Sequence, residues 1–155
     1  MRRSCQLFLT LLFLTTTLSA VAASGKVVKV LPTFLDLEGR HTLSPSLYDR
    51  DAYQAALRKN PEKRSGVRFD VLWRGRSEIL NQVATLRVEL RGTAKGDLPS
   101  HTTLEQPVQL TRSSHWAMLK IDGEKYKAFG EITAWRVTLW TDDGEMIGEQ
   151  KSFLW

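Results

Sequence analysis

The chain has 155 residues and a formal net charge of +5, and 42% of its residues are hydrophobic. This composition is typical of an ordinary globular domain, and it excludes a disordered chain, a collagen-like repeat and a coiled coil. Cys5 is the only cysteine, so a disulfide framework and a cysteine-based zinc cluster are excluded as well.

Residues 1–23 have the layout of a secretory signal peptide. Arg2 and Arg3 precede an apolar run over residues 7–18, and the small residues 19–23 follow. The run is too short to span a bilayer comfortably, because a spanning helix needs roughly 20 residues. We therefore predict cleavage near Ala22 or Ala23 and export to the periplasm or the extracellular space. The alternative for this segment is an N-terminal membrane anchor.

The exported part, residues 24–155, is predicted to be a single domain without cysteine and without a transmembrane segment. Removing Arg2 and Arg3 from the 22 basic residues leaves 20, against 17 acidic ones. This mild positive charge permits contact with an anionic envelope polymer, but it does not argue for nucleic acid.

Two elements are predicted in the first part of this domain. Residues 26–37 are strand-like, and Pro32 indicates an edge strand or a bulge there. Residues 44–61 predict the one convincing helix, with Ser44 as the capping residue and Pro45 at the first helical position. This helix, at about residues 45–60, is interpreted as an insertion that covers an edge or one end of a sheet.

From Gly66 onward the hydrophobic period changes to two, which is typical of half-buried strands. The clearest run has an apolar face formed by Ala84, Leu86, Val88 and Leu90. Strands are predicted over residues 67–74, 84–91, 102–110, 114–121, 132–140 and 146–155. Pro107 marks the third of these as an edge strand.

The last two predicted strands form a hairpin about residues 142–144. A two-residue turn at Asp143 and Gly144 places Arg136 opposite Lys151. A turn one residue earlier places Arg136 opposite Glu149 instead. Cross-strand pairs are worth only about 0.2–1 kcal/mol each, so they leave the register open.

Six or seven short strands without β-α-β alternation predict a mainly β fold, an antiparallel two-layer β-sandwich with one inserted α-helix. The strand count and patterning resemble immunoglobulin-like sandwiches. The Cys–Trp–Cys signature of antibody domains is absent, so no function carries over from this resemblance.

No catalytic constellation is visible in the sequence. His41, His101 and His115 are isolated, and neither G-x-S-x-G nor a phosphate-binding glycine motif occurs. The near pairs of carboxylates fall at the predicted helix start and at turns, where each has a structural role. We therefore predict no metal, no cofactor and no enzymatic activity. The basic cluster at residues 58–64 lacks interleaved aromatics, so nucleic acid is not expected.

The aromatic residues are the candidate binding groups. Trp73 and Trp135 fall on apolar strand faces and are predicted to lie in the core. The remaining tryptophans fall where the pattern is ambiguous or faces outward, and the chain ends in an apolar segment. The predicted binding residues are Trp116, Trp140, Phe153 and Trp155, because exposed aromatics stack on sugar rings or on apolar patches of partners. The alternative is that a helix or a second layer covers them.

The leading hypothesis is an exported, non-enzymatic β-sandwich that binds or assembles in the cell envelope or extracellular space. Its partner, which is unknown, would be a protein or an anionic envelope polymer, contacted through the exposed aromatics and the last strand. One alternative is a small secreted hydrolase or glycan-active enzyme that uses scattered carboxylates and a histidine. Another is a structural envelope subunit that assembles through edge strands.

Overall fold

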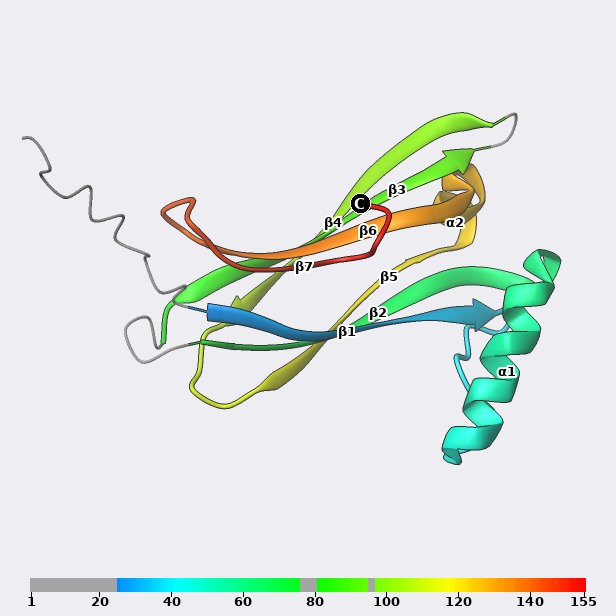
Figure 1. Ribbon diagram of the computed structural model, residues 1–155, viewed down its shortest axis with the longest axis horizontal. Helices are drawn as coiled ribbons and strands as arrows, with labels where there is room; N and C mark the ends of the chain where they lie inside the picture. The colour runs from blue at the N-terminus through cyan, green and yellow to red at the C-terminus, as the bar shows by residue number, and fades with distance from the viewer. Residues whose placement is uncertain (1–24, 76–80, 95–96) are drawn as a thin grey trace, which may run out of the picture.

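The computed structural model describes residues 25–75, 81–94 and 97–155. The predicted signal peptide and Cys5 lie outside these residues. Within them the chain forms antiparallel strands and two α-helices (Figure 1). In chain order the elements are β1 (Gly25–Asp36), α1 (Leu47–Lys59), the 3-10 helix η1 (Pro61–Lys63), β2 (Arg64–Gly75), β3 (Val83–Ala94), β4 (Leu98–Gln109), β5 (His115–Asp122), α2 (Gly123–Phe129), β6 (Glu131–Thr141) and β7 (Met146–Lys151).

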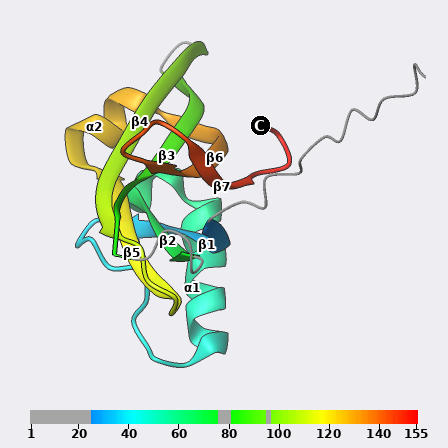
Figure 2. The ribbon, with the colours of Figure 1, turned by 90° about the vertical axis from the view of Figure 1, so that its left-hand side faces the viewer.

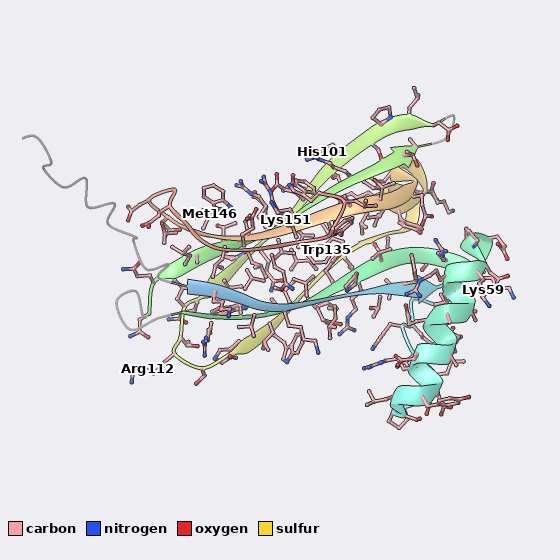
Figure 3. All side chains as sticks on the ribbon, in the orientation of Figure 1. Lys59, His101, Arg112, Trp135, Met146 and Lys151 are labelled. Carbon is pink, nitrogen blue, oxygen red and sulfur yellow. The ribbon has the colours of Figure 1, made fainter. Side chains whose placement is uncertain are left out.

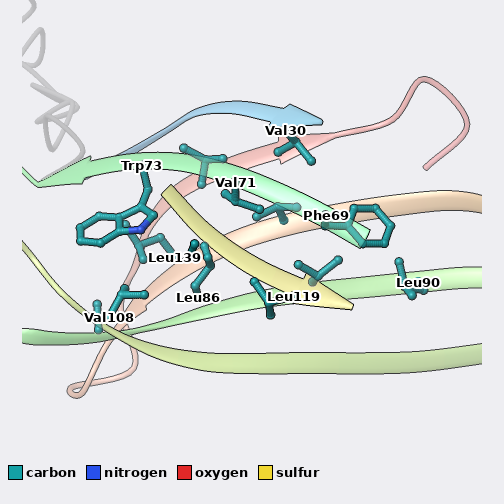
Figure 4. Packing of buried hydrophobic residues seen from close by; sticks show 14 of the residues in the cluster. Val30, Phe69, Val71, Trp73, Leu86, Leu90, Val108, Leu119 and Leu139 are labelled. Atoms are coloured by element: carbon teal, nitrogen blue, oxygen red, sulfur yellow. The ribbon is translucent and has the colours of Figure 1, made fainter. Parts of the chain in front are cut away.

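The strands form two antiparallel sheets, which confirms the prediction of a mainly β fold. The three-stranded sheet has the order β1-β2-β5, and the four-stranded sheet has the order β4-β3-β6-β7. Figures 1 and 2 show the two sheets lying one over the other. Their facing side chains form one hydrophobic core, which is shown in Figure 4.

The alternating pattern of β3 is realised as predicted. Ala84, Leu86, Val88 and Leu90 are each 0% exposed, whereas the residues between them are half-buried. Trp73 is buried in the same core, and Trp135 packs against it with its ring edge-to-face on Phe69. The sequence pattern therefore predicted correctly which face of these strands points inward.

Helix α1 begins two residues later than the sequence suggested. Ser46, rather than Ser44, is the N-cap, and its Oγ accepts a hydrogen bond from the Asp49 N–H at 3.4 Å. The helix stands at one end of the molecule (Figure 1). Only Gln54 and Leu57 of this helix are buried, and Leu47 is 65% exposed, so the rest of the protein covers the helix only in part.

The expectation of a single helix is wrong, because β5 and β6 are joined by a second helix, α2. It has seven residues, and it buries Tyr126 and Phe129, which are three positions apart on one face. A segment this short carries too little periodicity to be recognised in the sequence. Gly130, with φ of 84°, ends the helix and fits closely against the backbone of Thr93.

The hairpin of β6 and β7 has a three-residue loop rather than either of the two-residue turns considered. Gly144 has φ of 79°, and Thr141 and Glu145 close the loop. A bulge between Leu139 and Trp140 then restores the register in which Arg136 lies opposite Lys151. The like charges are compensated because Arg136 bonds Glu89 on β3 at 2.7 Å.

The predicted last strand ends at Lys151, four residues earlier than expected. Ser152 still pairs with Trp135, since its N–H donates to the Trp135 carbonyl at 2.9 Å and its Oγ accepts from the Trp135 N–H at 3.0 Å. The chain then turns, and the Trp155 N–H bonds the Ser152 carbonyl at 3.3 Å. The tail is therefore a turn that leaves the sheet.

Two polar side chains fix α1 to the end of β1. The amide of Gln54 accepts from the Phe34 N–H at 2.8 Å and donates to the carbonyls of Phe34 and His41 at 2.9 and 2.8 Å. The carboxylate of Asp36 accepts from the Tyr53 hydroxyl at 2.5 Å. Together with Pro32, which has no N–H, the Gln54 amide occupies the free edge of β1.

The two flanks of the molecule differ. On one flank β7 crosses close to β1, because a Cβ at Gly148 would lie 3.0 Å from the Val27 nitrogen and one at Gly25 would lie 2.8 Å from Ile147. We call this line of contact the glycine seam, defined by Gly25 and Gly148. On the other flank the edge strands β4 and β5 border a cavity of about 340 Å³.

Candidate functional site: the Trp116 face

The four predicted binding residues do not lie together. Trp116 is on β5, on the outer face of the three-stranded sheet, where it is 54% exposed. Trp140 and Trp155 lie on the outer face of the four-stranded sheet, and Phe153 lies in the tail.

Trp140 and Trp155 are engaged by the protein's own side chains. The indole N–H of Trp140 donates to the Thr138 hydroxyl at 2.8 Å, and the guanidinium of Arg87 lies 5.3 Å from its ring centre. The Trp155 ring is contacted by two guanidinium groups, those of Arg91 at 4.0 Å and Arg136 at 4.9 Å. These cation–π contacts occupy ring surface that a ligand would need.

The charges on this outer face are also largely paired internally. Arg87 bonds Glu105 at 2.7 Å, and Arg136 bonds Glu89 at the same distance. The hydrogen bond from Arg136 lowers the pKa of Glu89 below its ordinary value. His101 and Lys151 lie on the outer side of the same sheet (Figure 3). This face therefore offers a ligand few unused groups.

Phe153 is fully exposed, with a relative exposure of 101%, and Leu154 is 70% exposed. Both follow Ser152, which is the last residue paired to β6. Their side chains are accessible, and among the described residues no hydrogen bond or ion pair involves them.

The outer face of the three-stranded sheet carries an exposed apolar centre. Strand register places Leu72 of β2 between Lys29 of β1 and Trp116 of β5. In the adjacent row Met118 of β5 is 49% exposed and lies opposite Asp70. We call the outward side chains of this sheet the Trp116 face; they comprise Lys26, Lys29, Leu31, Arg68, Asp70, Leu72, Arg74, Trp116, Met118 and Lys120.

Cations surround this apolar centre. Arg68 bonds Asp70 at 2.7 Å, and Lys120 bonds Asp122 at 2.6 Å. Among the described residues no carboxylate lies within ion-pair distance of Lys26, Lys29 or Arg74, which are all exposed. The face therefore combines an exposed indole with unneutralised positive charge, which attracts anionic groups.

One residue in the sequence, Leu72, indicates this face, although the pattern of β2 alone did not predict a site there. Leu72 is an apolar residue on the otherwise polar side of β2, between Asp70 and Arg74. Its significance depends on the neighbours that β1 and β5 supply, namely Lys29 and Trp116, and strand order is not visible in one sequence.

The cavity between β4 and β5 adjoins Trp116. Inward side chains of both sheets line it, including Trp73 and Ala117 from one sheet and Gln106 and Val108 from the other. Gln106 was also missed, although it is a polar residue at an inward position between Leu104 and Val108. A polar residue at a core-facing position is a signal that a strand borders a cavity or a partner.

The three histidines lie on separate parts of the fold. His41 follows β1, close to α1, whereas His115 begins β5 at the opposite end of the same sheet, and His101 is on β4 of the other sheet. Over residues 25–75, 81–94 and 97–155, no group of three histidine, cysteine, aspartate or glutamate side chains is placed to hold a metal ion. In this same part of the chain, every helix is too short or too polar to cross a bilayer.

Comparison with known proteins adds no relative. No protein-family model matches the chain, and no match was found among curated proteins or solved structures. The geometry and chemistry of the Trp116 face are therefore what indicates a function.

Proposed function

We propose that the protein is an exported, non-enzymatic binding module of the cell envelope or extracellular space, and that the Trp116 face contacts an anionic polymer. The observation that carries this proposal is that Trp116 and Met118 are exposed on the same face as Lys29 and Arg74, for which no carboxylate of the described residues lies within ion-pair distance. An indole supplies apolar contact area with a polar handle, and the cations supply attraction to anionic groups.

An immunoglobulin-like β-sandwich is the proposed fold class. In constant-type immunoglobulin domains the first, second and fifth strands share one sheet, and the third, sixth and seventh share the other. The strands of this chain divide in the same way. Only β4 differs, because it pairs with β3, where variable-type domains place an additional strand. Such sandwiches commonly act as binding modules, although the fold alone does not identify a ligand.

Export is part of the same proposal, and the sequence of residues 1–23 supports it. The N-terminal sequence of protein recovered from the periplasm or medium tests it. A mature N-terminus at residue 23 or 24 is expected. Recovery of the uncleaved chain in the cytoplasm alone would contradict export.

Retention on immobilised dextran sulfate, a model polyanion, tests the contact surface. The double variant Lys29→Glu and Arg74→Glu should lower the affinity about tenfold or more, because each cation near an anionic surface contributes about 1 kcal/mol. Trp116→Ala should also weaken retention without changing the thermal midpoint of unfolding. Retention of the wild-type chain should fall as salt is raised.

The matched control is the double variant Lys59→Glu and Lys125→Glu, which changes the net charge by the same amount. These lysines belong to α1 and α2, which lie at one end of the molecule (Figure 1). It should retain most of the affinity. Equal losses in both double variants would mean that only net charge matters, and the Trp116 face would not be the contact surface.

A further inference from the structure

An apolar cavity opens between the two sheets where β7 ends. It has a volume of about 230 Å³, and residues of both sheets line it. Pro32 and Phe34 of β1 lie on one side, and Ile132 and Trp135 of β6 lie on the other. All four residues are exposed or half-buried, so a group from outside can contact them. Burial of this accessible apolar surface by an occupant is favourable.

The cavity is open because no strand of the described chain continues the sheet past this point. The pairing of β6 with β7 ends at Arg136 and Lys151, and Ser152 makes the last backbone bond, to Trp135. The first residues of β6, from Glu131 onward, have no hydrogen-bonded strand on this side among the described residues. Ser152 lines the cavity, so the tail starts at the rim.

The tail leaves an apolar corner exposed beside this cavity. Phe153 is 101% exposed and Leu154 is 70% exposed; we call this pair the tail corner. The ring of Trp155 is held by Arg91 and Arg136 on the outer face of the four-stranded sheet, so the tail turns back over that sheet (Figure 1). The tail corner therefore stays outside the cavity of its own chain, and neither of its residues belongs to the lining.

The lining favours an aromatic occupant. Arg58, at the end of α1, is the charged residue of the lining; it is exposed, and no carboxylate of the described residues lies within ion-pair distance of it. A guanidinium in this position can stack on an aromatic ring, as that of Arg64 does over Phe34 at 4.0 Å. A cavity of about 150 Å³ is enough to hold a benzene ring, so this cavity has room for a phenyl group.

We propose that two copies of this chain form a symmetric dimer in which the Phe153 ring of each copy enters the cavity of the other. A projecting corner and a cavity on the same flank are self-complementary, because a two-fold axis between two copies pairs both at once. Arg58 of one copy lies over the Phe153 ring of the other, and Leu154 packs at the rim. The second copy therefore covers apolar surface that the single chain leaves exposed.

The area of this contact sets the strength of the dimer. A phenylalanine side chain buries roughly 150–250 Å², so the two rings and the cavity walls that they cover account for roughly 600–1,000 Å². With Leu154 of both copies, the total approaches the lower end for specific interfaces, which is about 1,200 Å². The dimer is therefore weak and reversible, and it forms at micromolar to millimolar concentrations of the chain.

Sedimentation velocity of the full-length chain at increasing concentration tests the dimer. The wild type should pass from monomer to dimer over the micromolar to millimolar range. Phe153→Ser should raise the dissociation constant by about a hundredfold or more, because the symmetric contact is lost twice. The matched control is Tyr48→Ser, which removes an aromatic ring that is 83% exposed on α1 and should leave the dimer unchanged. A wild type that stays monomeric, or an equal loss in both variants, would overturn the proposal.

Mixing two variants separates this arrangement from any other dimer. Thr133→Trp places a bulky ring at the cavity but leaves the tail corner intact, so this variant should be monomeric as well. Thr103→Trp, at an exposed position of β4, is its control and should dimerise as the wild type does.

An equimolar mixture of Thr133→Trp and Phe153→Ser contains one intact tail corner and one intact cavity for each mixed pair. It should dimerise more weakly than the wild type and more strongly than either variant alone, which a misfolded variant could not do. A mixture that stays monomeric would mean that the chain's own tail or another protein covers the cavity, and it would overturn the proposal.

This dimer is independent of the proposed function. No residue of the Trp116 face lines the cavity, and the sedimentation experiment contains no polyanion. A failure of dimerisation therefore leaves the dextran sulfate result standing, and a failure of retention leaves the dimer standing.

Discussion

Asp36 shows how one buried charge is held at the end of β1. Burial by itself raises the pKa of this carboxyl, but the hydrogen bonds from the Tyr53 hydroxyl, the Arg40 N–H and the Arg40 side chain outweigh it and lower the pKa from 3.8 to about 2. A group whose pKa is lower in the folded state than in the unfolded state stabilises the fold above the unfolded value.

The stability contributed by Asp36 should therefore be present above pH 3.8 and be lost as the pH falls towards 2. Asp36→Asn should lower the free energy of unfolding by about 2 kcal/mol at pH 7, and should flatten its decline between pH 4 and pH 2. Urea unfolding at pH 7, 4 and 2.5 measures both effects. Asp143→Asn, in the exposed hairpin loop, is the control and should keep the wild-type pH dependence. The same decline in Asp36→Asn as in the wild type would contradict this role.

At the residue scale the sequence predicted the apolar interior well and the polar interior poorly. The inward positions of β3 follow from period two, because burial of apolar area is non-directional and additive. Three polar or charged residues are buried as well, namely Asp36, Gln54 and Arg64. The residues next to them in the sequence give no sign of this burial. Each is buried because specific partners distant in sequence satisfy it, and those partners are known only from the fold.

Among the elements, α1 is attached to β1 by the Gln54 amide as well as by the hydrogen bond from Tyr53 to Asp36. Gln54→Leu keeps the size of the side chain but removes its bonds to Phe34 and His41. The free energy of unfolding should fall by about 1–3 kcal/mol, because polar backbone groups are left unpaired. Hydrogen exchange should show lost protection of the Phe34 amide, whereas Gln82→Leu should leave it protected. Full protection in Gln54→Leu would mean that the amide does not hold this edge.

The elements that were predicted correctly are those with a long, regular pattern. Strands of eight to twelve residues such as β2, β3 and β5 repeat their signal several times. Helix α2 and the loop at Gly144 are short, and the bulge at Leu139 shifts the register by one residue without any mark in the composition. Such local irregularities depend on what packs against them, so they become visible only in the structure.

For the molecule as a whole, one core joins both sheets. Phe69 and Val71 from the three-stranded sheet belong to the same buried cluster as Leu86 and Leu139 from the other. Neither sheet has a second apolar core of its own within the described residues, so the domain should unfold in one transition.

Leu86→Ala should therefore destabilise both sheets together, by about 2–5 kcal/mol. Urea unfolding followed by tryptophan fluorescence and by far-ultraviolet circular dichroism should give coincident curves in wild type and variant. Val83→Ala, at a half-exposed position of the same strand, should change stability by only about 0.5 kcal/mol. Two separated transitions would show that the sheets fold independently.

At this scale the two layers were predictable, but the location of the site was not. The neighbours of each tryptophan depend on strand order. The cavity depends on β4 and β5, which are edge strands of different sheets and are not hydrogen-bonded to each other. Trp116 and Gln106 are brought together by the approach of β4 to β5, although they are ten positions apart in the chain.

The glycine seam has a mechanical consequence. Gly148 brings β7 against the backbone of β1 at Val27, and Gly25 leaves room for the Ile147 side chain, so a small rotation of one layer against the other about this line would leave the seam unchanged. Displacement grows with distance from an axis, so the same small rotation that leaves the seam unchanged opens or narrows the entrance bordered by Gln106 and Trp116 the most. A bulky residue at position 148 would force the axis apart and change the width of that entrance from the far side of the molecule.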